Sequence, residues 1–289
     1  MAFFLRTFIK YLLLPVGIVY SLFNKQEDEI LILMYHRVND NSNKELAVSR
    51  RNFYWHMSYL YKKGFNIITM DEVCSMISGN TIKGKNIVIT FDDGYLDYYT
   101  NAYPILKRYK FPSITYLCPG YIGTCKKYQW DRDEENAPVM DWQHIHRLNS
   151  EGLVEFGSHT VNHVDMDKLD LVDIDRELKL SKYILEKKLG RPIRHFAYPR
   201  GIYSGSGEEI LKRYYDTAVL ISNGKPINRQ CGIEHIYTLK RIPVLKSDGK
   251  YLFAARLKGW LAAEEFARNN LDRLRIISSN ILHLLTLKK

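Results

Sequence analysis

The stretch that decides the fold class is NIVITFDDG, residues 86–94. It is apolar through Phe91 apart from two polar residues, and a short apolar run of this length is typical of a strand buried on both faces. The run ends at two adjacent carboxylates, Asp92 and Asp93, which are followed by the turn residue Gly94. Because polar groups that act on ligands gather at the C-terminal ends of strands in α/β barrels, the segment predicts a buried parallel strand with a site at its end.

On both sides of this segment, short apolar runs alternate with stretches of helical spacing that end at turn residues such as Gly64 and Gly190. The alternation predicts a parallel α/β sheet or barrel in one domain. A Gly-rich dinucleotide fingerprint and a phosphate-binding loop are both absent from the sequence. The other expected strands are Glu29–Tyr35, Phe65–Thr69, Ser113–Cys118, Val154–Phe156, Phe196–Tyr198 and Thr217–Ile221, and the expected helices begin near Ser49, Asp71, Tyr98 and Asp173.

The composition excludes several classes of protein. The chain has 289 residues, of which 46% are hydrophobic and 26% charged, so it can bury a full core and is not disordered as a whole. Its four cysteines are too few for a disulfide framework. The formal net charge of +10 suits an acidic polymer, an anionic membrane surface or nucleic acid. The sequence contains no nucleic-acid-binding motif, and we therefore expect no nucleic-acid partner.

The first 25 residues form a hydrophobic segment that we interpret as membrane-directed. Arg6 and Lys10 precede an apolar run from Tyr11 to Phe23, which is short for a membrane span and suits the apolar region of a signal peptide. The cations before the run and the acidic residues 27–29 after it favour an inside start and an outside body. The alternative is an amphipathic or buried helix that packs on the domain.

The last residues, 256–289, are expected to form a basic amphipathic helix, because apolar residues recur there in steps of three or four with arginines beside them. Such a helix either docks on the domain or contacts a membrane surface or a partner. Residues 26–255 remain as the central domain. Together the two ends predict a membrane-associated or extracytoplasmic protein, with the cytoplasmic face as the alternative.

A second motif, SHTVNH at residues 158–163, follows the expected strand at 154–156. Its two histidines, His159 and His163, are four residues apart and reach one ion if the segment turns helically. With Asp93 they would form a set of two histidines and one aspartate that leaves positions open for water and substrate. Either motif alone would also fit a helix-start loop or a surface histidine pair, but the two together indicate a metal site.

TFDDG followed by SHTxxH resembles the polysaccharide deacetylase family, which carries the NodB homology domain and forms carbohydrate esterase family 4. More narrowly, the chain is similar to the bacterial branch that contains the poly-N-acetylglucosamine deacetylases. That branch opens on a MYHRV-like motif, here Met34–Val38, and has a Phe-Ala-Tyr-Pro-x-Gly element, here Phe196–Gly201. The resemblance runs from about residue 30 to about residue 260.

The resemblance implies a distorted (β/α) barrel that removes N-acetyl groups from amino sugars with one divalent metal ion, usually Zn²⁺. It implies that Asp93, His159 and His163 hold the metal and that Asp92 is the general base. The backbone N–H of Arg200 would bind the oxyanion, and His36 would donate a proton to the leaving amine. The residues implied to bind substrate are Trp142, Tyr198 and Pro199.

Two positions depart from the family pattern. Many relatives have an arginine two residues before the motif proline that pairs with the base, and this chain has Ala197 there, as the branch does. Arg200 replaces a usual aromatic residue, and its cation could face an acidic or phosphorylated substrate. The expected substrate is an N-acetylated glycan or a lipid-linked sugar. The alternatives are an O-acetyl esterase with the same metal site and a carbohydrate-binding relative without turnover.

Overall fold

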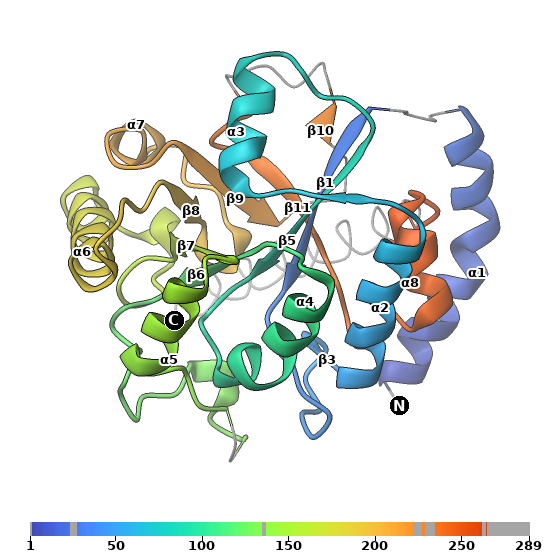
Figure 1. Cartoon of the computed structure of the whole chain (residues 1–289), viewed down its shortest axis with the longest axis horizontal. Coiled ribbons are helices and arrows are strands. Elements are labelled where there is room, and N and C mark those ends of the chain that lie inside the picture. Colours follow the sequence, from blue (N-terminus) through green and yellow to red (C-terminus); the bar gives the residue numbers. More distant parts are fainter. Residues whose placement is uncertain are drawn as a thin grey trace, which may run out of the picture.

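The computed structural model describes residues 2–23, 28–134, 137–221, 227–228, 235–261 and 264, and within these the side chains of 2–4, 20, 22–23 and 227–228 are left out. Seven parallel strands form a closed barrel with helices around it (Figure 1). Their order is β1-β11-β9-β8-β7-β6-β5, and β5 pairs back onto β1. The strands are β1 (Glu29–Tyr35), β5 (Lys85–Phe91), β6 (Ser113–Leu117), β7 (Val154–Ser158), β8 (His195–Ala197), β9 (Thr217–Ile221) and β11 (Leu239–Pro243). This arrangement confirms the barrel.

The closure between β1 and β5 fixes the position of the first site residues. Seven residue pairs join the two strands in register, the last being Tyr35 with Phe91. The backbone N–H of Asp92 donates to the carbonyl oxygen of Tyr35 at 3.1 Å. His36 and Asp92 therefore leave the barrel together at its C-terminal end. Short strands extend this frame: β4 (Asn66–Ile67) lies beside β5, β10 (Ile227–Asn228) is antiparallel to β1, and β2 (Arg37–Val38) pairs with β3 (Ala47–Val48).

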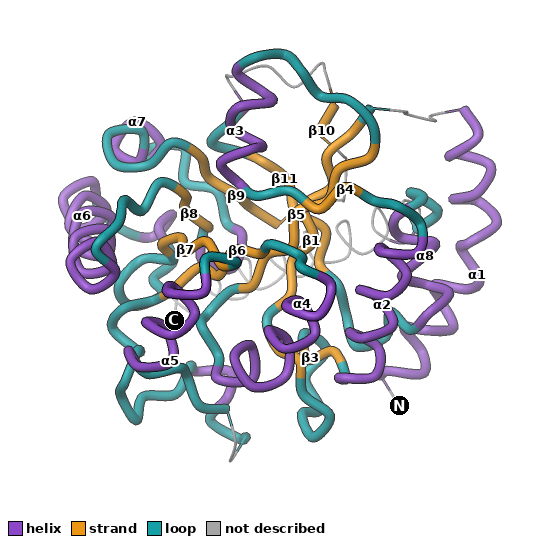
Figure 2. Tube along the Cα trace, in the orientation of Figure 1, coloured by secondary structure: helices purple, strands orange, loops and turns teal. Residues whose placement is uncertain are grey.

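Helices surround the barrel, as the secondary-structure colouring of Figure 2 shows. Successive side chains of β1 point to opposite faces of the barrel wall. Leu31 and Leu33 pack outward, in the large core under α2. Ile30 and Ile32 point inward, into a second core that α3 closes at one end of the barrel. The helices are α2 (Arg50–Lys62), α3 (Met70–Ser78), α4 (Tyr103–Tyr109), α5 (Trp142–Glu151), α6 (Leu171–Leu189), α7 (Glu208–Leu211) and α8 (Lys250–Leu257).

Three local expectations need correction. The helix expected from Tyr98 begins as a π-helical turn, Tyr98–Ala102, and becomes α4 only at Tyr103, because Pro104 has no N–H to donate to an earlier carbonyl. The strand expected at 65–69 is reduced to β4. The sequence analysis also missed β11, whose apolar run is interrupted by Lys240 and Arg241.

The two ends of the chain differ in how far the structure describes them. Residues Ala2–Phe23 form one helix, α1, which contains Pro15. Among the described helices, none combines the length and the apolarity that crossing a membrane requires. At the other end, α8 stops at Leu257 and a turn follows to Leu261. Apart from that turn and residue 264, the amphipathic helix expected over 256–289 lies outside the described residues.

Candidate active site

Three predicted metal ligands converge at the C-terminal end of the barrel. Asp93 Oδ1 lies 3.6 Å from His159 Nε2 and 3.5 Å from His163 Nε2. Asp93 is fully buried, and neither of its carboxylate oxygens has a hydrogen-bond partner within the described part of the chain. Burial, and next the charge of Asp92, raise the pKa of Asp93 well above its usual value. A buried carboxylate without donors, facing two imidazoles, fits a cation site.

The protonation of His159 is set by its other ring nitrogen. Nδ1 of His159 lies 2.7 Å from the carbonyl oxygen of Ala197 at the end of β8. A carbonyl oxygen only accepts, so Nδ1 carries the proton and the lone pair of Nε2 faces Asp93. This second contact orients the ring in the way typical of metal-ligating histidines. The imidazole is therefore ready to bind a metal ion without a further change of tautomer.

The backbone around these ligands is held in conformations that ordinary residues avoid. Asp93, Thr160 and His163 have φ angles of 71°, 61° and 54°. Such left-handed positions cost free energy outside glycine, and they persist where surrounding contacts fix them. Part of that fixation comes from Glu177 on α6, whose buried carboxylate accepts from the backbone N–H groups of Val161 at 2.8 Å and Asn162 at 3.2 Å. The sequence analysis did not identify Glu177.

The predicted general base, Asp92, is anchored by an arginine from the far end of the sequence. Arg241 on β11 donates from both terminal nitrogens to the two oxygens of Asp92, at 2.6 and 2.7 Å. Burial alone would raise the pKa of Asp92, but the guanidinium charge outweighs it and lowers that pKa below its usual range. Arg241 thus makes the contact to Asp92 that the resemblance assigned to an arginine at the position of Ala197. Its only signal in the sequence is a charge inside a buried strand.

His36 lies beside the same carboxylate, with Nε2 at 3.9 Å from Asp92 Oδ2. Burial lowers the pKa of His36 to about 4, although the charge of Asp92 works in the opposite direction. The ring is therefore uncharged near neutral pH. Its Nδ1 is buried without a hydrogen-bond partner among the described residues. The structure brings His36 to the base as expected, and its role as proton donor stays a prediction.

Two aromatic side chains that the sequence analysis missed stand against the metal ligands. The Trp130 ring meets the His163 ring edge to face at 4.7 Å between centroids, and it stacks on Tyr128 at 4.9 Å. Tyr128 also donates from its hydroxyl to the backbone carbonyl of Asp93 at 2.9 Å. Trp130 is half-buried and so keeps part of its surface open to a ligand. Both residues lie in the loop that joins β6 to α5.

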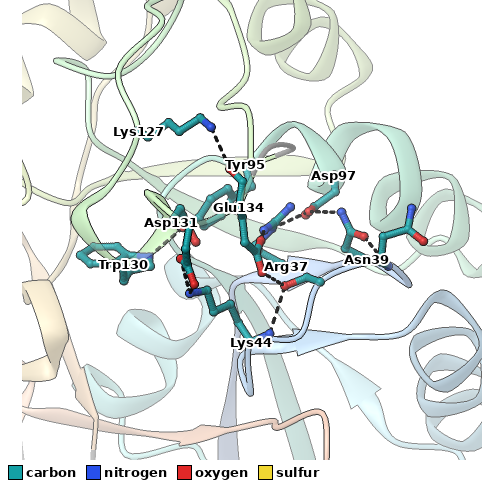
Figure 3. A network of polar contacts seen from close by, with 12 residues as sticks. Arg37, Asn39, Lys44, Tyr95, Asp97, Lys127, Trp130, Asp131 and Glu134 are labelled. Carbon is teal, nitrogen blue, oxygen red and sulfur yellow. Dashed lines mark hydrogen bonds and ion pairs between the residues drawn. The ribbon is translucent and has the colours of Figure 1, made fainter.

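A polar network holds this loop in place (Figure 3). Trp130 Nε1 donates to the hydroxyl of Tyr95 at 2.9 Å, and that hydroxyl donates to Asp131. The buried guanidinium of Arg37 lies 5.0 Å from the Tyr95 ring centroid, pairs with Asp97 at 2.8 Å, and pairs with Glu134. The segment after His36 therefore fixes the loop that carries Trp130, and the indole is positioned rather than free to swing.

The residues predicted to bind substrate have no described contact with the predicted metal ligands. Trp142 starts α5, where Lys188 lies 5.3 Å from its ring centroid, and no described contact joins it to the metal ligands. Tyr198 and Pro199 are buried, and Tyr198 packs against Phe196 in the core. Their roles in binding substrate stay predictions.

Arg200 lies after Pro199 in a short 3-10 turn, with a left-handed φ of 56°. Its side chain is half-exposed and pairs through Nε with Asp165 at 3.1 Å. Because that carboxylate already neutralises the guanidinium, the side chain offers less charge to an acidic substrate than the sequence suggested. The backbone role of Arg200 stays a prediction.

Comparisons with known proteins agree with this site. A model of the polysaccharide deacetylase family matches residues 79–218. The Bacillus subtilis (strain 168) protein named "Putative polysaccharide deacetylase YxkH" is 29% identical over 235 residues. The alignment covers 78% of this chain and 75% of that protein. A poly-beta-1,6-N-acetyl-D-glucosamine N-deacetylase of Staphylococcus aureus (strain MSSA476) is 25% identical over 210 residues, 65% and 70% of the two chains.

The fold has solved counterparts as well. The structure of IcaB from Ammonifex degensii aligns with a TM-score of 0.67 at 25% identity and covers 81% of this chain and 98% of that one. The matched family model includes Asp92, Asp93 and both metal-facing histidines. The family model, the relatives and the barrel together make this chain similar to the polysaccharide deacetylases, with the match to the family model confined to residues 79–218.

Proposed function

We propose that this chain is a metal-dependent N-deacetylase that hydrolyses the acetamide of an amino sugar in a surface polysaccharide or glycolipid. The single observation that supports it best is the convergence of Asp93, His159 and His163 beside a base that Arg241 anchors. The free carboxylate oxygens of Asp93 and the open Nε2 of His159 suit a divalent cation, and Zn²⁺ is the first candidate. When bound, such an ion acidifies water and polarises the acetyl carbonyl.

Each of the remaining site residues has one role in the proposed hydrolysis. Asp92, kept ionised by Arg241, takes a proton from the attacking water. The backbone N–H of Arg200 donates to the oxygen that becomes negative. The proton that Asp92 takes from the water passes to His36, whose Nε2 lies 3.9 Å away, and from His36 to the leaving amine. Trp130 offers an aromatic face to the sugar next to His163. The reaction releases acetate and leaves a free amine on the glycan.

The substrate class rests on the relatives. The S. aureus relative is named for poly-β-1,6-N-acetylglucosamine, so a polymer of N-acetylated amino sugars is the first substrate to test. An N-acetylated lipid-linked sugar carries the same reacting group. An O-acetyl ester would use the same metal site, and release of acetate from O-acetylated but not from N-acetylated sugars would favour that second activity.

The test is acetate release from N-acetylglucosamine oligomers by the purified full chain. Release that a chelator stops, that Zn²⁺ restores and that Asp92→Asn abolishes supports the proposal. The metal content of each sample is measured in parallel, since Asp92→Asn should retain the ion whereas Asp93→Asn should lose it. Metal-loaded protein that binds the oligomers without releasing acetate would instead be the carbohydrate-binding relative, and the proposal would fail.

A further inference from the structure

The N-terminal helix α1 is joined to the barrel by a buried ion cluster. Lys10 is almost inaccessible to solvent, and its Nζ donates to Ser247 Oγ at 2.6 Å and to Asp248 Oδ1 at 2.7 Å. Arg256 on α8 donates to the same carboxylate at 2.9 and 3.0 Å. Burial alone would raise the pKa of Asp248, but the two cations lower it below its usual range. Removing Lys10 from this cluster would leave a buried charge less well compensated, which is costly.

Packing continues the attachment along the second half of α1. Gly17 lies so close to Trp260 that a β-carbon there would meet its backbone oxygen at 1.8 Å. Leu14 packs against the buried Leu252 and Leu261. Close approach at a glycine and a shared apolar cluster are features of helices packed inside one folded domain. Both halves of α1 are therefore bound to the α8 region, at the outer edge of the barrel seen in Figure 1.

The opposite face of α1 is apolar and uncovered. Leu5, Phe8, Leu12, Val16 and Val19 recur in steps of three or four and expose between 56 and 64% of their surface. Lys10, Leu14 and Gly17 fall on the other side of the helix, so the exposed residues form one continuous stripe. Single exposed apolar residues are ordinary, but a stripe of this length marks an interaction surface.

Cations and aromatic side chains flank the stripe. A groove of about 280 Å³ beside α1 is lined by Tyr11, Lys246, Lys250 and Tyr251, and Tyr251 is 79% exposed. Neither α1 nor α8 contains an aspartate or glutamate. Lysines with tyrosines beside an apolar stripe match the headgroup region of an anionic bilayer.

We propose that α1 is a permanent part of the folded protein and lies in the plane of an anionic membrane, with its stripe among the acyl chains and its flanking lysines on lipid phosphates. A second copy of the chain is the competing occupant. The charge disfavours it, because a symmetric contact would bring together the cationic flanks of two chains that each carry +10. The proposal is independent of the proposed deacetylase activity.

The test is co-sedimentation of the full chain with vesicles of phosphatidylcholine, with and without phosphatidylglycerol. We expect binding to the anionic vesicles that salt weakens, and a loss of more than about tenfold in the double variant Leu12→Glu, Val16→Glu. The matched control is Val172→Glu on α6, a residue 75% exposed and remote from α1, which should bind as the wild type does. Circular dichroism checks that both variants are folded.

Three results would overturn the proposal. One is a protein that does not bind the anionic vesicles, or that binds equally well with the double variant. Another is a wild-type dimer in light scattering that the double variant converts to a monomer, which would assign the stripe to a second copy. The last is an intact mass showing that mature protein from cells has lost α1.

Discussion

Arg241 and Asp92, 149 residues apart in the sequence, form a two-point ion pair inside the barrel at 2.6 and 2.7 Å. The pair joins the last strand of the barrel, β11, to the end of β5, where the predicted catalytic carboxylates follow. The carboxylate is thereby fixed in orientation as well as in charge, because a guanidinium that donates two parallel hydrogen bonds allows one arrangement of its partner. If Asp92 is the base, Arg241 is a positioning residue, which acts on the reaction through Asp92.

Replacing Arg241 should therefore reduce turnover more than substrate binding. We expect Arg241→Met to lower kcat by at least about a hundredfold with little change in KM, since the base loses its orientation and its ionised form loses a partner. Arg241→Lys should recover only part of kcat, because an ammonium cannot make both hydrogen bonds. Steady-state kinetics at matched metal content measure this. The prediction would be contradicted if Arg241→Lys and Arg241→Met lost kcat equally, or if kcat did not change in either variant.

Divalent metal should stabilise the fold through the predicted ligands. A ligand that binds only the native state raises stability by RT ln(1 + [L]/Kd), about 2.7 kcal/mol at a hundredfold excess over Kd. Zn²⁺ added to chelator-treated protein should thus raise Tm. The rise should vanish in Asp93→Asn and His163→Ala and persist in Asp92→Asn, whose oxygens are held by Arg241. A Tm increase that survives Asp93→Asn would place the metal elsewhere.

Glu177 should control metal affinity without touching the metal. Its carboxylate holds the turn that carries His163, and loss of such a supporting contact typically weakens metal binding by about 10- to 100-fold. We expect Glu177→Gln to weaken metal binding by about tenfold and Glu177→Ala by about a hundredfold. Competition with a fluorescent Zn²⁺ chelator measures the affinity. Asp173→Asn on the same helix, a half-exposed residue paired only with Arg176 in the described ion pairs, is the control and should bind as the wild type.

The two tryptophans can be separated by kinetics. Trp130 contacts His163, whereas Trp142 has no described contact with the metal ligands, so Trp130→Ala should raise KM for N-acetylglucosamine oligomers by about tenfold and Trp142→Ala by much less. Trp130→Phe, which keeps an aromatic face, should restore part of the loss. The reverse order of effects would assign the sugar-binding face to Trp142, as the sequence alone suggested.

Acidification should destabilise the protein through His56. This ring is fully buried against Phe253, with Nδ1 at 3.2 Å from the Tyr35 hydroxyl and Nε2 at 3.1 Å from the Asp248 carbonyl oxygen. Burial lowers the pKa of His56 from 6.5 to about 4. Between these values the unfolded chain binds a proton that the folded chain does not, so the stability that is fully present above pH 6.5 is lost as the pH falls towards 4.

The full loss from this one group amounts to about 3 kcal/mol. Urea unfolding at several pH values should therefore show a smaller slope against pH in His56→Gln than in the wild type across that window. His146→Gln, a change at an exposed histidine, should leave the slope unaltered. Parallel slopes for wild type and His56→Gln would contradict the assignment.

The sequence predicted the site residues that lie together in one short segment, and it missed those whose contacts lie on distant elements. The carboxylates 92–93 and the pair His159 and His163 each lie within one short segment at a strand end, so strand geometry and spacing were enough to place them together. Arg241, Glu177 and Trp130 act through partners on other elements. Their positions follow from barrel closure and from the loop network of Arg37, which no local pattern in the chain records.

Barrel closure has a consequence for biosynthesis. His36 follows β1, the first of the seven strands to leave the ribosome, whereas Arg241 lies on β11, the last. A nascent chain that has just exposed residue 218 already contains every predicted metal ligand, yet its base still lacks the arginine that orients it. Stalled or truncated products that end before Leu239 would lack both the strand that closes the barrel and the arginine that orients the predicted base, so we expect activity only when translation is nearly complete.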